Sequence, residues 1–261
     1  MPEFTSYLPG TPSWVDLSTS EVTTAQAFYS SLFGWSVGDT GPDGGGYAMF
    51  LLRGKYVAGV GPHVAEGQPS AWTTYVSVED ADATTEKVRA AGGQVVVEPM
   101  DVLDVGRMAV LVDPTGAPFA IWQPRAHQGA QLADEPGAFC WNELQTRDTA
   151  AAEAFYTSVF GWEPRTSDMP GIAYTEWRQG EHTVGGMMTV PDEVPPQIPA
   201  YWLVYFAVED CDVTVAKATE LGGASLLEPT DIAPGRFAVL TDPAGAVFAV
   251  ITMRMSAGAQ R

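Results

Sequence analysis

Short stretches of alternating hydrophobic and polar residues recur along the chain, and each is followed by a helical pattern. Residues 14–19 and 72–78 alternate in this way and predict strands. In residues 21–33 the apolar side chains recur at helical spacing, which predicts a helix that ends near Gly34. A second helix is expected to begin at Asp80 or Asp82, either of which can cap it, and to stop at residues 92–93, a pair of glycines.

Turns rich in glycine and proline separate three further short strands after each helix. Residues 41–46 (GPDGGG) carry the glycines of a tight hairpin. The segments DPTG (113–116) and DPAG (242–245) place proline at the second position of a turn. The order of strand, helix and three strands, found four times, predicts an α+β fold rather than a parallel α/β fold.

The chain contains an internal repeat. Residues 14–35 match residues 141–162 without a gap, and the FGW that closes the helix recurs in both. Residues 78–99 match 208–229, and residues 106–122 match 235–251. The repeat predicts two related domains, 1–125 and 137–261, joined by a polar linker over 126–136.

Composition and charge narrow the class of protein. Thirteen Lys and Arg against 32 Asp and Glu give a formal charge of −19, which argues against nucleic acid and anionic membranes as partners. Cys140 and Cys211 form neither a disulfide framework nor a zinc motif. The N-terminus lacks a signal-peptide pattern, and no apolar stretch approaches the roughly 20 residues of a membrane span. We therefore expect a cytoplasmic protein.

The motifs of both repeats resemble the vicinal oxygen chelate superfamily. The resemblance is carried by a strand and a helix closing with A-F-Y-x-x-x-F-G-W, and by VEDADATTEKVRAAGG…EP…GR…VLVDPTGAPFAIWQ. The family includes glyoxalase I, bleomycin-resistance proteins, fosfomycin-resistance enzymes and extradiol dioxygenases. The resemblance implies two tandem glyoxalase-like domains, each of two βαβββ modules whose curled mixed sheets form a cavity.

The resemblance also locates the positions where this family binds its metal. They lie on the opening strand of each module and on the last strand of each half, and they fall here on Trp14, Thr73, Ala120, Trp141, Leu203 and Ala249. None of these residues offers the carboxylate, imidazole or thiolate that a divalent metal needs. The histidines at 63, 127 and 182 lie in separate regions. We therefore expect no metal and no other cofactor.

Strand alternation places candidate site residues inside each cavity. If Trp14 and Trp141 face inward, so do Asp16 and Glu143, which gives each aromatic-walled cavity one carboxylate. Burial would raise the pKa of such a carboxyl group, which could then act as a general acid or base. The expected substrate-binding residues are Trp14, Thr73, Tyr75, Arg107, Trp122, Trp141, Tyr205 and Arg236.

These residues also have structural interpretations. Asp16 and Glu143 could be held by a backbone amide or by Arg107 and Arg236. Trp14 and Trp141 could seal a sheet edge or a domain interface. Trp35 and Trp162 are expected in the core, and Cys140 is not expected to be reactive because no basic group is near it in sequence.

Two functions remain open from the sequence, with a metal enzyme that uses unorthodox ligands as a more distant third. The first is an enzyme that acts on a small aromatic or oxygenated metabolite without a metal, through lyase, isomerase or tailoring chemistry with a carboxylate acid or base. The second is a protein that binds and sequesters a small, antibiotic-like molecule between tryptophans. The expected partner is a small molecule, and the chain is expected to be a monomer with internal pseudo-symmetry or a homodimer.

Overall fold

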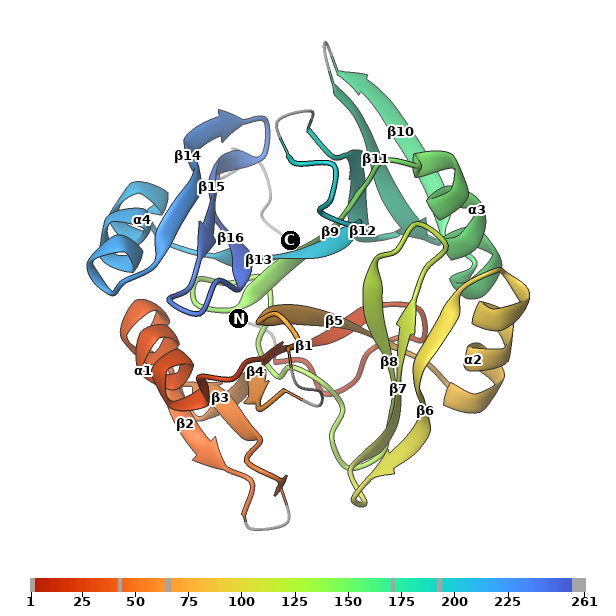
Figure 1. Ribbon diagram of the computed structural model, residues 1–261, viewed down its shortest axis with the longest axis horizontal. Helices are drawn as coiled ribbons and strands as arrows, with labels where there is room; N and C mark the ends of the chain where they lie inside the picture. The colour runs from red at the N-terminus through yellow and green to blue at the C-terminus, as the bar shows by residue number, and fades with distance from the viewer. Residues whose placement is uncertain (1–2, 42–43, 64–66, 170–171, 192–193, 255–261) are drawn as a thin grey trace. The chain divides into compact units, whose positions relative to one another are not determined.

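The computed structural model describes residues 3–41, 44–63, 67–169, 172–191 and 194–254. Within these ranges the chain forms sixteen strands and four helices, in the order strand, helix and three strands repeated four times (Figure 1). This order confirms the predicted α+β class and its βαβββ modules. None of the helices in the described part of the chain is long and apolar enough to cross a membrane.

The first repeat holds two modules. The first comprises β1 (Pro12–Ser18), α1 (Val22–Phe33), β2 (Ser36–Asp39), β3 (Ala48–Leu52) and β4 (Lys55–Gly61). The second comprises β5 (Ala71–Ser77), α2 (Ala81–Ala90), β6 (Gln94–Val102), β7 (Gly106–Val112) and β8 (Pro118–Pro124).

The second repeat has the same two modules. The first comprises β9 (Phe139–Thr146), α3 (Thr149–Phe160), β10 (Glu163–Met169), β11 (Ile172–Gln179) and β12 (His182–Thr189). The second comprises β13 (Tyr201–Ala207), α4 (Cys211–Glu220), β14 (Ala224–Ile232), β15 (Gly235–Thr241) and β16 (Val247–Met253).

Helices α1 and α2 begin and end within about two residues of the predicted bounds. Helix α1 ends at Gly34, whose φ of 74° is a left-handed conformation that glycine adopts without strain. Gly161 ends α3 in the same way, with a φ of 72°. Of the two aspartates predicted to cap α2, Asp80 does so, because its side chain accepts a hydrogen bond from the Ala83 backbone N–H.

The predicted turns join the strands on either side of them. In the DPTG turn, Asp113 accepts hydrogen bonds from the backbone N–H groups of Thr115 and Ala117, at 2.8 and 3.0 Å. Strands β2 and β3 pair antiparallel across the predicted hairpin, with Asp39 opposite Ala48. Residues 42–43 of that hairpin lie outside the described residues.

Each sequence repeat supplies one mixed sheet of eight strands. The strand order is β2-β3-β4-β1-β5-β8-β7-β6 in the first sheet and β10-β11-β12-β9-β13-β16-β15-β14 in the second. Strands β1 and β4 are parallel, with Asp16 opposite Gly59, and β9 and β12 are parallel, with Glu143 opposite Gly186. The two parallel pairings place equivalent residues of the repeats opposite glycines.

The described chain also divides into two compact units that each combine segments of both repeats. The first unit contains residues 1–15, 73–131 and 141–204, and the second contains residues 16–72, 132–140 and 205–261. Helices α2 and α3 therefore belong to the first unit and lie side by side in it, and α1 and α4 do so in the second (Figure 1). Each unit joins one module of each repeat.

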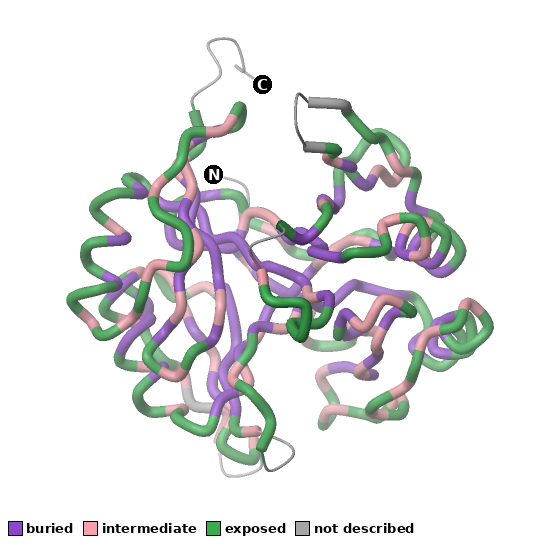
Figure 2. The backbone as a smooth tube through the Cα atoms, turned by 45° about the horizontal axis from the view of Figure 1, so that its top comes forward, coloured by how far each residue is buried: buried purple, intermediate pink, exposed green. Residues whose placement is uncertain are grey.

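The core of each unit contains aromatic side chains, and each of the four helices has buried residues along it (Figure 2). In the first unit Phe119 packs against Phe155 and Tyr156, with ring centroids 6.1 and 5.8 Å apart. In the second unit Phe28 packs against Phe248 at 6.3 Å. Trp35 and Trp162 are buried, which confirms their predicted place in the core.

A buried tyrosine links the two modules of each unit by hydrogen bonds. In the first unit the Tyr156 hydroxyl donates to Asp113 at 2.9 Å and accepts from the Trp202 indole at 2.9 Å. Tyr29 does the same in the second unit, donating to Asp242 at 3.2 Å and accepting from Trp72 at 2.9 Å. Trp72 and Trp202 thus serve the core in both units.

Candidate functional site

The second repeat places a carboxylate beneath a tyrosine on the sheet formed by β9, β12 and β11. Glu143 on β9 lies opposite Gly186 on β12, and Tyr174 comes from the adjacent strand β11. A Cβ atom at Gly186 would collide with the Tyr174 hydroxyl and lie 2.9 Å from the Trp141 indole nitrogen. Glycine at 186 therefore lets the Tyr174 ring lie across β12 toward Glu143.

A chain of hydrogen bonds holds this carboxylate. Glu143 is only 4% exposed. It accepts a hydrogen bond from Gln145 Nε2 at 2.6 Å and is hydrogen-bonded to the Tyr174 side chain. The Tyr174 hydroxyl in turn accepts from Trp141 Nε1 at 2.9 Å. We call Trp141, Glu143, Gln145 and Tyr174 the Glu143 cluster.

The tyrosines near Glu143 are held in their neutral form. Burial raises the pKa of Tyr174, and the negative charge of Glu143 and its hydrogen bond raise it further. Burial and the charge of Glu143 also raise the pKa of Tyr201, although the Arg147 charge opposes them. Both phenols keep their proton at neutral pH, and the Tyr174 hydroxyl group remains hydrogen-bonded to the Glu143 carboxylate.

Arg147 fixes the segment that leads to Tyr201. Its guanidinium donates to the backbone carbonyls of Val194, Pro195 and Ile198 at 3.1, 3.1 and 2.7 Å. Because β13 begins three residues after Ile198, this contact positions Tyr201 at the start of the strand. Arg147 is exposed, and its bonds hold the segment from outside the cluster.

An equivalent arrangement occurs in the first repeat. Tyr47 donates to Asp16 Oδ2 at 3.2 Å, and its ring lies over Gly59, where a Cβ atom would collide with the hydroxyl. Asp16 is half-buried, whereas Glu143 is buried. Ser18 replaces Gln145 and lies 3.1 Å from His63 Nδ1. The two clusters share their tyrosine, glycine and carboxylate positions and differ in their other polar groups.

Sequence reasoning missed Tyr47 and Tyr174. The signal was present, because extending the gapless match beyond residue 35 pairs Tyr47 with Tyr174 and Gly59 with Gly186 at the same offset as Asp16 and Glu143. Trp141 and Glu143, which strand alternation places on the same face, are linked through Tyr174.

Trp14 and Trp122, both predicted to bind substrate, are packed against the linker. His127 lies edge-on to Trp14 at a centroid distance of 4.6 Å and to Trp122 at 5.7 Å. The Trp122 indole also donates to the His127 backbone carbonyl at 2.9 Å. Burial lowers the pKa of His127 to about 4, so its imidazole is neutral at pH 7.

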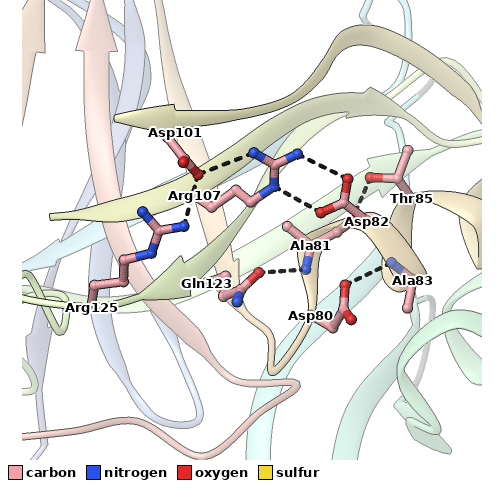
Figure 3. A network of polar contacts seen from close by, with 9 residues as sticks. All are labelled: Asp80, Ala81, Asp82, Ala83, Thr85, Asp101, Arg107, Gln123 and Arg125. Carbon is pink, nitrogen blue, oxygen red and sulfur yellow. Dashed lines mark hydrogen bonds and ion pairs between the residues drawn. The ribbon is translucent and has the colours of Figure 1, made fainter. Parts of the chain in front are cut away.

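Arg107 and Arg236 take part in surface ion networks. Arg107 binds Asp82 through two nitrogens at 2.8 and 2.9 Å and Asp101 at 3.0 Å, and Arg125 also binds Asp101 (Figure 3). Arg236 binds Asp212 through two nitrogens at 2.6 and 2.9 Å and contacts Asp231 at 3.4 Å.

The hydrogen bonds with Arg107 lower the pKa values of Asp82 and Asp101, and the one with Arg236 lowers that of Asp212. Each guanidinium is thus occupied by exposed aspartates. As substrate-binding groups, Arg107 and Arg236 remain predictions.

The remaining predicted residues lie on the second modules. Tyr75 and Tyr205 are buried and are Cα partners of Ala120 and Ala249, two of the family's metal positions. Tyr205 stacks on Phe237 at 6.1 Å. Thr73, on the same strand as Tyr75, is half-buried. Burial, with a smaller contribution from Asp134, raises the pKa of the Cys140 thiol, which disfavours its reactive thiolate form.

The residues at the family's metal positions do not fit a divalent cation. Tryptophan, threonine, leucine and alanine occupy them, and none supplies a strong donor. Among the described residues, no group of three His, Cys, Asp or Glu side chains is placed to hold a metal ion. Glu143 has its carboxylate engaged by Gln145 and Tyr174 instead.

Comparison with known proteins identifies the family. Residues 11–121 match the Glyoxalase/Bleomycin resistance protein/Dioxygenase superfamily, and residues 141–251 match the Glyoxalase-like domain. The chain is 45% identical to "Putative glyoxylase CFP32" of Mycobacterium tuberculosis, over 96% of this chain and 98% of that protein. This chain belongs to the vicinal oxygen chelate superfamily. It is also 40% identical to "Anthracycline biosynthesis protein DnrV" of Streptomyces peucetius, over 96% of both chains.

Solved structures of the vicinal oxygen chelate superfamily share the fold. The Mn(II)-bound glyoxalase from Novosphingobium aromaticivorans superposes with a TM-score of 0.66 at 18% identity, over 94% of this chain and 82% of that one. The 2,2',3-trihydroxybiphenyl 1,2-dioxygenase from Sphingomonas wittichii strain RW1 gives a TM-score of 0.65 at 14% identity, over 94% and 91%. The tandem glyoxalase-like architecture predicted from the repeat is thereby confirmed.

Proposed function

We propose that this protein acts on a small aromatic, oxygenated metabolite and that Glu143 is its general acid or base. The main support for the proposal is the buried carboxylate of Glu143, which accepts a hydrogen bond from Gln145 and is hydrogen-bonded to Tyr174. A carboxylate withdrawn from water and surrounded by neutral donors can take a proton from an acidic O–H or C–H group and return it to another atom. Isomerase, lyase or tailoring reactions require such a transfer.

The chemistry of the relatives supports an aromatic substrate. DnrV is named for anthracycline biosynthesis, and anthracyclines contain fused aromatic rings that carry hydroxyl and carbonyl groups. The half-buried Trp141 beside Glu143 offers an aromatic surface for such rings. Asp16 and Tyr47 would provide a second, more exposed site of the same kind.

We further propose that the reaction does not use the divalent metal of this family. The support is the set of side chains at the metal positions, where indole, hydroxyl and aliphatic groups stand in place of ligands. The acid or base would then have to work without a metal to acidify the substrate, and the hydrogen bonds from Gln145 and Tyr174 would hold the Glu143 carboxylate in place for this role.

A second candidate function is binding without conversion. The position of Trp141 favours it, because a partly exposed indole held by Tyr174 can stack on a flat ligand without any proton transfer. A protein of this kind would sequester an antibiotic-like molecule, as resistance members of the family do.

Incubation with hydroxylated anthraquinones, followed by mass spectrometry, separates the two functions. The enzyme proposal predicts a changed product with the wild-type protein, formed at least about 100-fold more slowly with Glu143→Gln. Sequestration predicts saturable quenching of tryptophan fluorescence and quantitative recovery of the unchanged ligand. Conversion at the wild-type rate by Glu143→Gln would contradict the assignment of Glu143.

A further inference from the structure

The Gln145 side chain has one hydrogen-bonding group in use and one without a partner. Its Nε2 donates to Glu143 Oε1 at 2.6 Å. Its Oε1 has no hydrogen-bond partner among the described residues, although the residue is only 5% exposed. If the Gln145 amide were flipped, Oε1 would face the Glu143 carboxylate, and two acceptors cannot form a hydrogen bond. The contact with Glu143 therefore assigns Nε2 as the bonded atom and Oε1 as the unpaired acceptor.

The neighbouring donors are already committed. The Trp141 indole N–H donates to Tyr174, and Tyr174 is bonded to Glu143. Nearly all buried acceptors in folded proteins have a donor, because an unsatisfied one loses its hydration without compensation. A hydroxyl group of a molecule bound at the Glu143 cluster could supply the donor that Gln145 Oε1 lacks.

We propose that Gln145 is a specificity-determining residue that accepts a hydrogen bond from a phenolic or enolic hydroxyl group of the ligand. The inference rests on the function proposed above and adds the chemical group that the site selects. A hydroxyl group fits better than a second carbonyl, because a carbonyl oxygen would meet two acceptors, Gln145 Oε1 and the Glu143 carboxylate. An O-methylated ligand has no proton to donate and would leave Oε1 unsatisfied.

This arrangement predicts a measurable preference between matched ligands. A site built to accept a hydrogen bond rejects an analogue that lacks the donor, because the buried acceptor then stays unpaired. Loss of one such bond corresponds to roughly tenfold weaker binding. The preference should be absent when residue 145 has no acceptor.

The test compares 2-hydroxyanthraquinone with 2-methoxyanthraquinone at about pH 6, where the phenol keeps its proton. Dissociation constants are measured by quenching of tryptophan fluorescence for the wild type and Gln145→Met. Methionine matches glutamine in length without its acceptor. Gln94→Met, at an exposed position of β6 outside both clusters, is the matched control, and circular dichroism checks that each variant is folded.

The wild type should bind the hydroxylated probe about tenfold more tightly than the methoxy probe. Gln145→Met should bind both equally, while Gln94→Met keeps the preference. An equal loss of affinity for both probes in Gln145→Met would overturn the role of Gln145, as would a wild type that binds both alike. If the wild type binds neither probe, the proposed function itself fails. Binding without preference contradicts only the role of Gln145.

Discussion

At the scale of single residues, two carboxylates in equivalent positions have different surroundings. Glu143 is buried and hydrogen-bonded to Gln145 and Tyr174. Asp16 is half-buried and hydrogen-bonded to Tyr47. Both tyrosines reach their carboxylates only because a glycine lies beneath the ring. A single methyl group on that glycine should therefore disturb the site more than the fold.

We predict that Gly186→Ala weakens the function of the Glu143 cluster. The added Cβ would collide with the Tyr174 hydroxyl and displace it from Glu143. We expect turnover or ligand affinity to fall at least tenfold, with a loss of about 1–3 kcal/mol in the free energy of unfolding. Gly59→Ala is the matched control in the first repeat. Unchanged function in Gly186→Ala would show that Tyr174 is dispensable.

The buried imidazole of His127 predicts a pH dependence of stability. Its folded-state pKa of about 4 lies below the usual 6.5, so the unfolded chain binds more protons between these values. The neutral form therefore stabilises the fold above pH 6.5, and this contribution disappears as the pH falls toward 4.

Between pH 6.5 and pH 4, the free energy of unfolding should fall by about 2 kcal/mol less in His127→Gln than in the wild type. Urea unfolding at both pH values measures this difference. His182, which is exposed on β12, provides the control His182→Gln. Equal losses of stability in the wild type and His127→Gln would refute a neutral buried imidazole.

At the scale of elements, the two repeats build the same helix with different caps. Asp148 caps α3 by accepting from the Ala151 backbone N–H at 3.0 Å. Glu21 occupies the equivalent position before α1, and its side chain makes no capping hydrogen bond. The longer glutamate side chain is a poor N-cap, because a short side chain is needed to reach back to the first turn.

This difference predicts an asymmetry between two alanine substitutions. Asp148→Ala should lower the free energy of unfolding by about 1 kcal/mol, because it removes the cap of α3. Glu21→Ala should change it by less than about 0.5 kcal/mol. Denaturant unfolding of both variants provides the comparison, and equal effects would show that the Asp148 bond contributes nothing to stability.

At the scale of the whole molecule, the compact units do not follow the sequence repeats. Each unit takes one module from each repeat, and buried contacts such as Tyr156 with Asp113 and Tyr29 with Asp242 join them. The aromatic residues of α3 that pack against Phe119 also join a module of one repeat to a module of the other. Neither repeat alone contains a complete core of this kind.

We therefore predict that residues 1–125 and 137–261, expressed separately, do not unfold cooperatively. Each half would expose the aromatic face that the other half covers. Co-expression of the two halves should restore a cooperative transition, as seen by circular dichroism and calorimetry. Independent cooperative unfolding of either half would contradict the shared cores.

Much of the fold could be predicted from the sequence because its signals are local. The glycine at 34, the aspartate at 80 and the DPTG turn each act within a few residues, and all three perform the predicted role. Which module packs with which could not be predicted in this way, because the two halves carry the same hydrophobic pattern. The partners of Tyr29 and Tyr156 depend on tertiary contacts more than 40 residues away.

The site was predictable only in part. Alternation along β9 identified Glu143, but Tyr174 reaches it from another strand across a glycine, and strand periodicity does not reveal contacts of that kind. The surface partners of Arg107 and Arg236 were missed because Asp82 and Asp212 lie on helices that precede them by more than 20 residues. Long-range pairing of charged groups leaves no pattern in a single sequence.

The most direct test of the central claim is the turnover of a hydroxylated anthraquinone by chelator-treated protein. Wild type, Glu143→Gln and Asp16→Asn are compared side by side after metal removal. We expect the treated wild type to keep its activity and Glu143→Gln to lose about 100-fold or more, the typical contribution of a general acid or base. Asp16→Asn should have the smaller effect, since Asp16 is more exposed. Full activity in both variants, or loss of activity on metal removal with recovery on adding it back, would contradict the account.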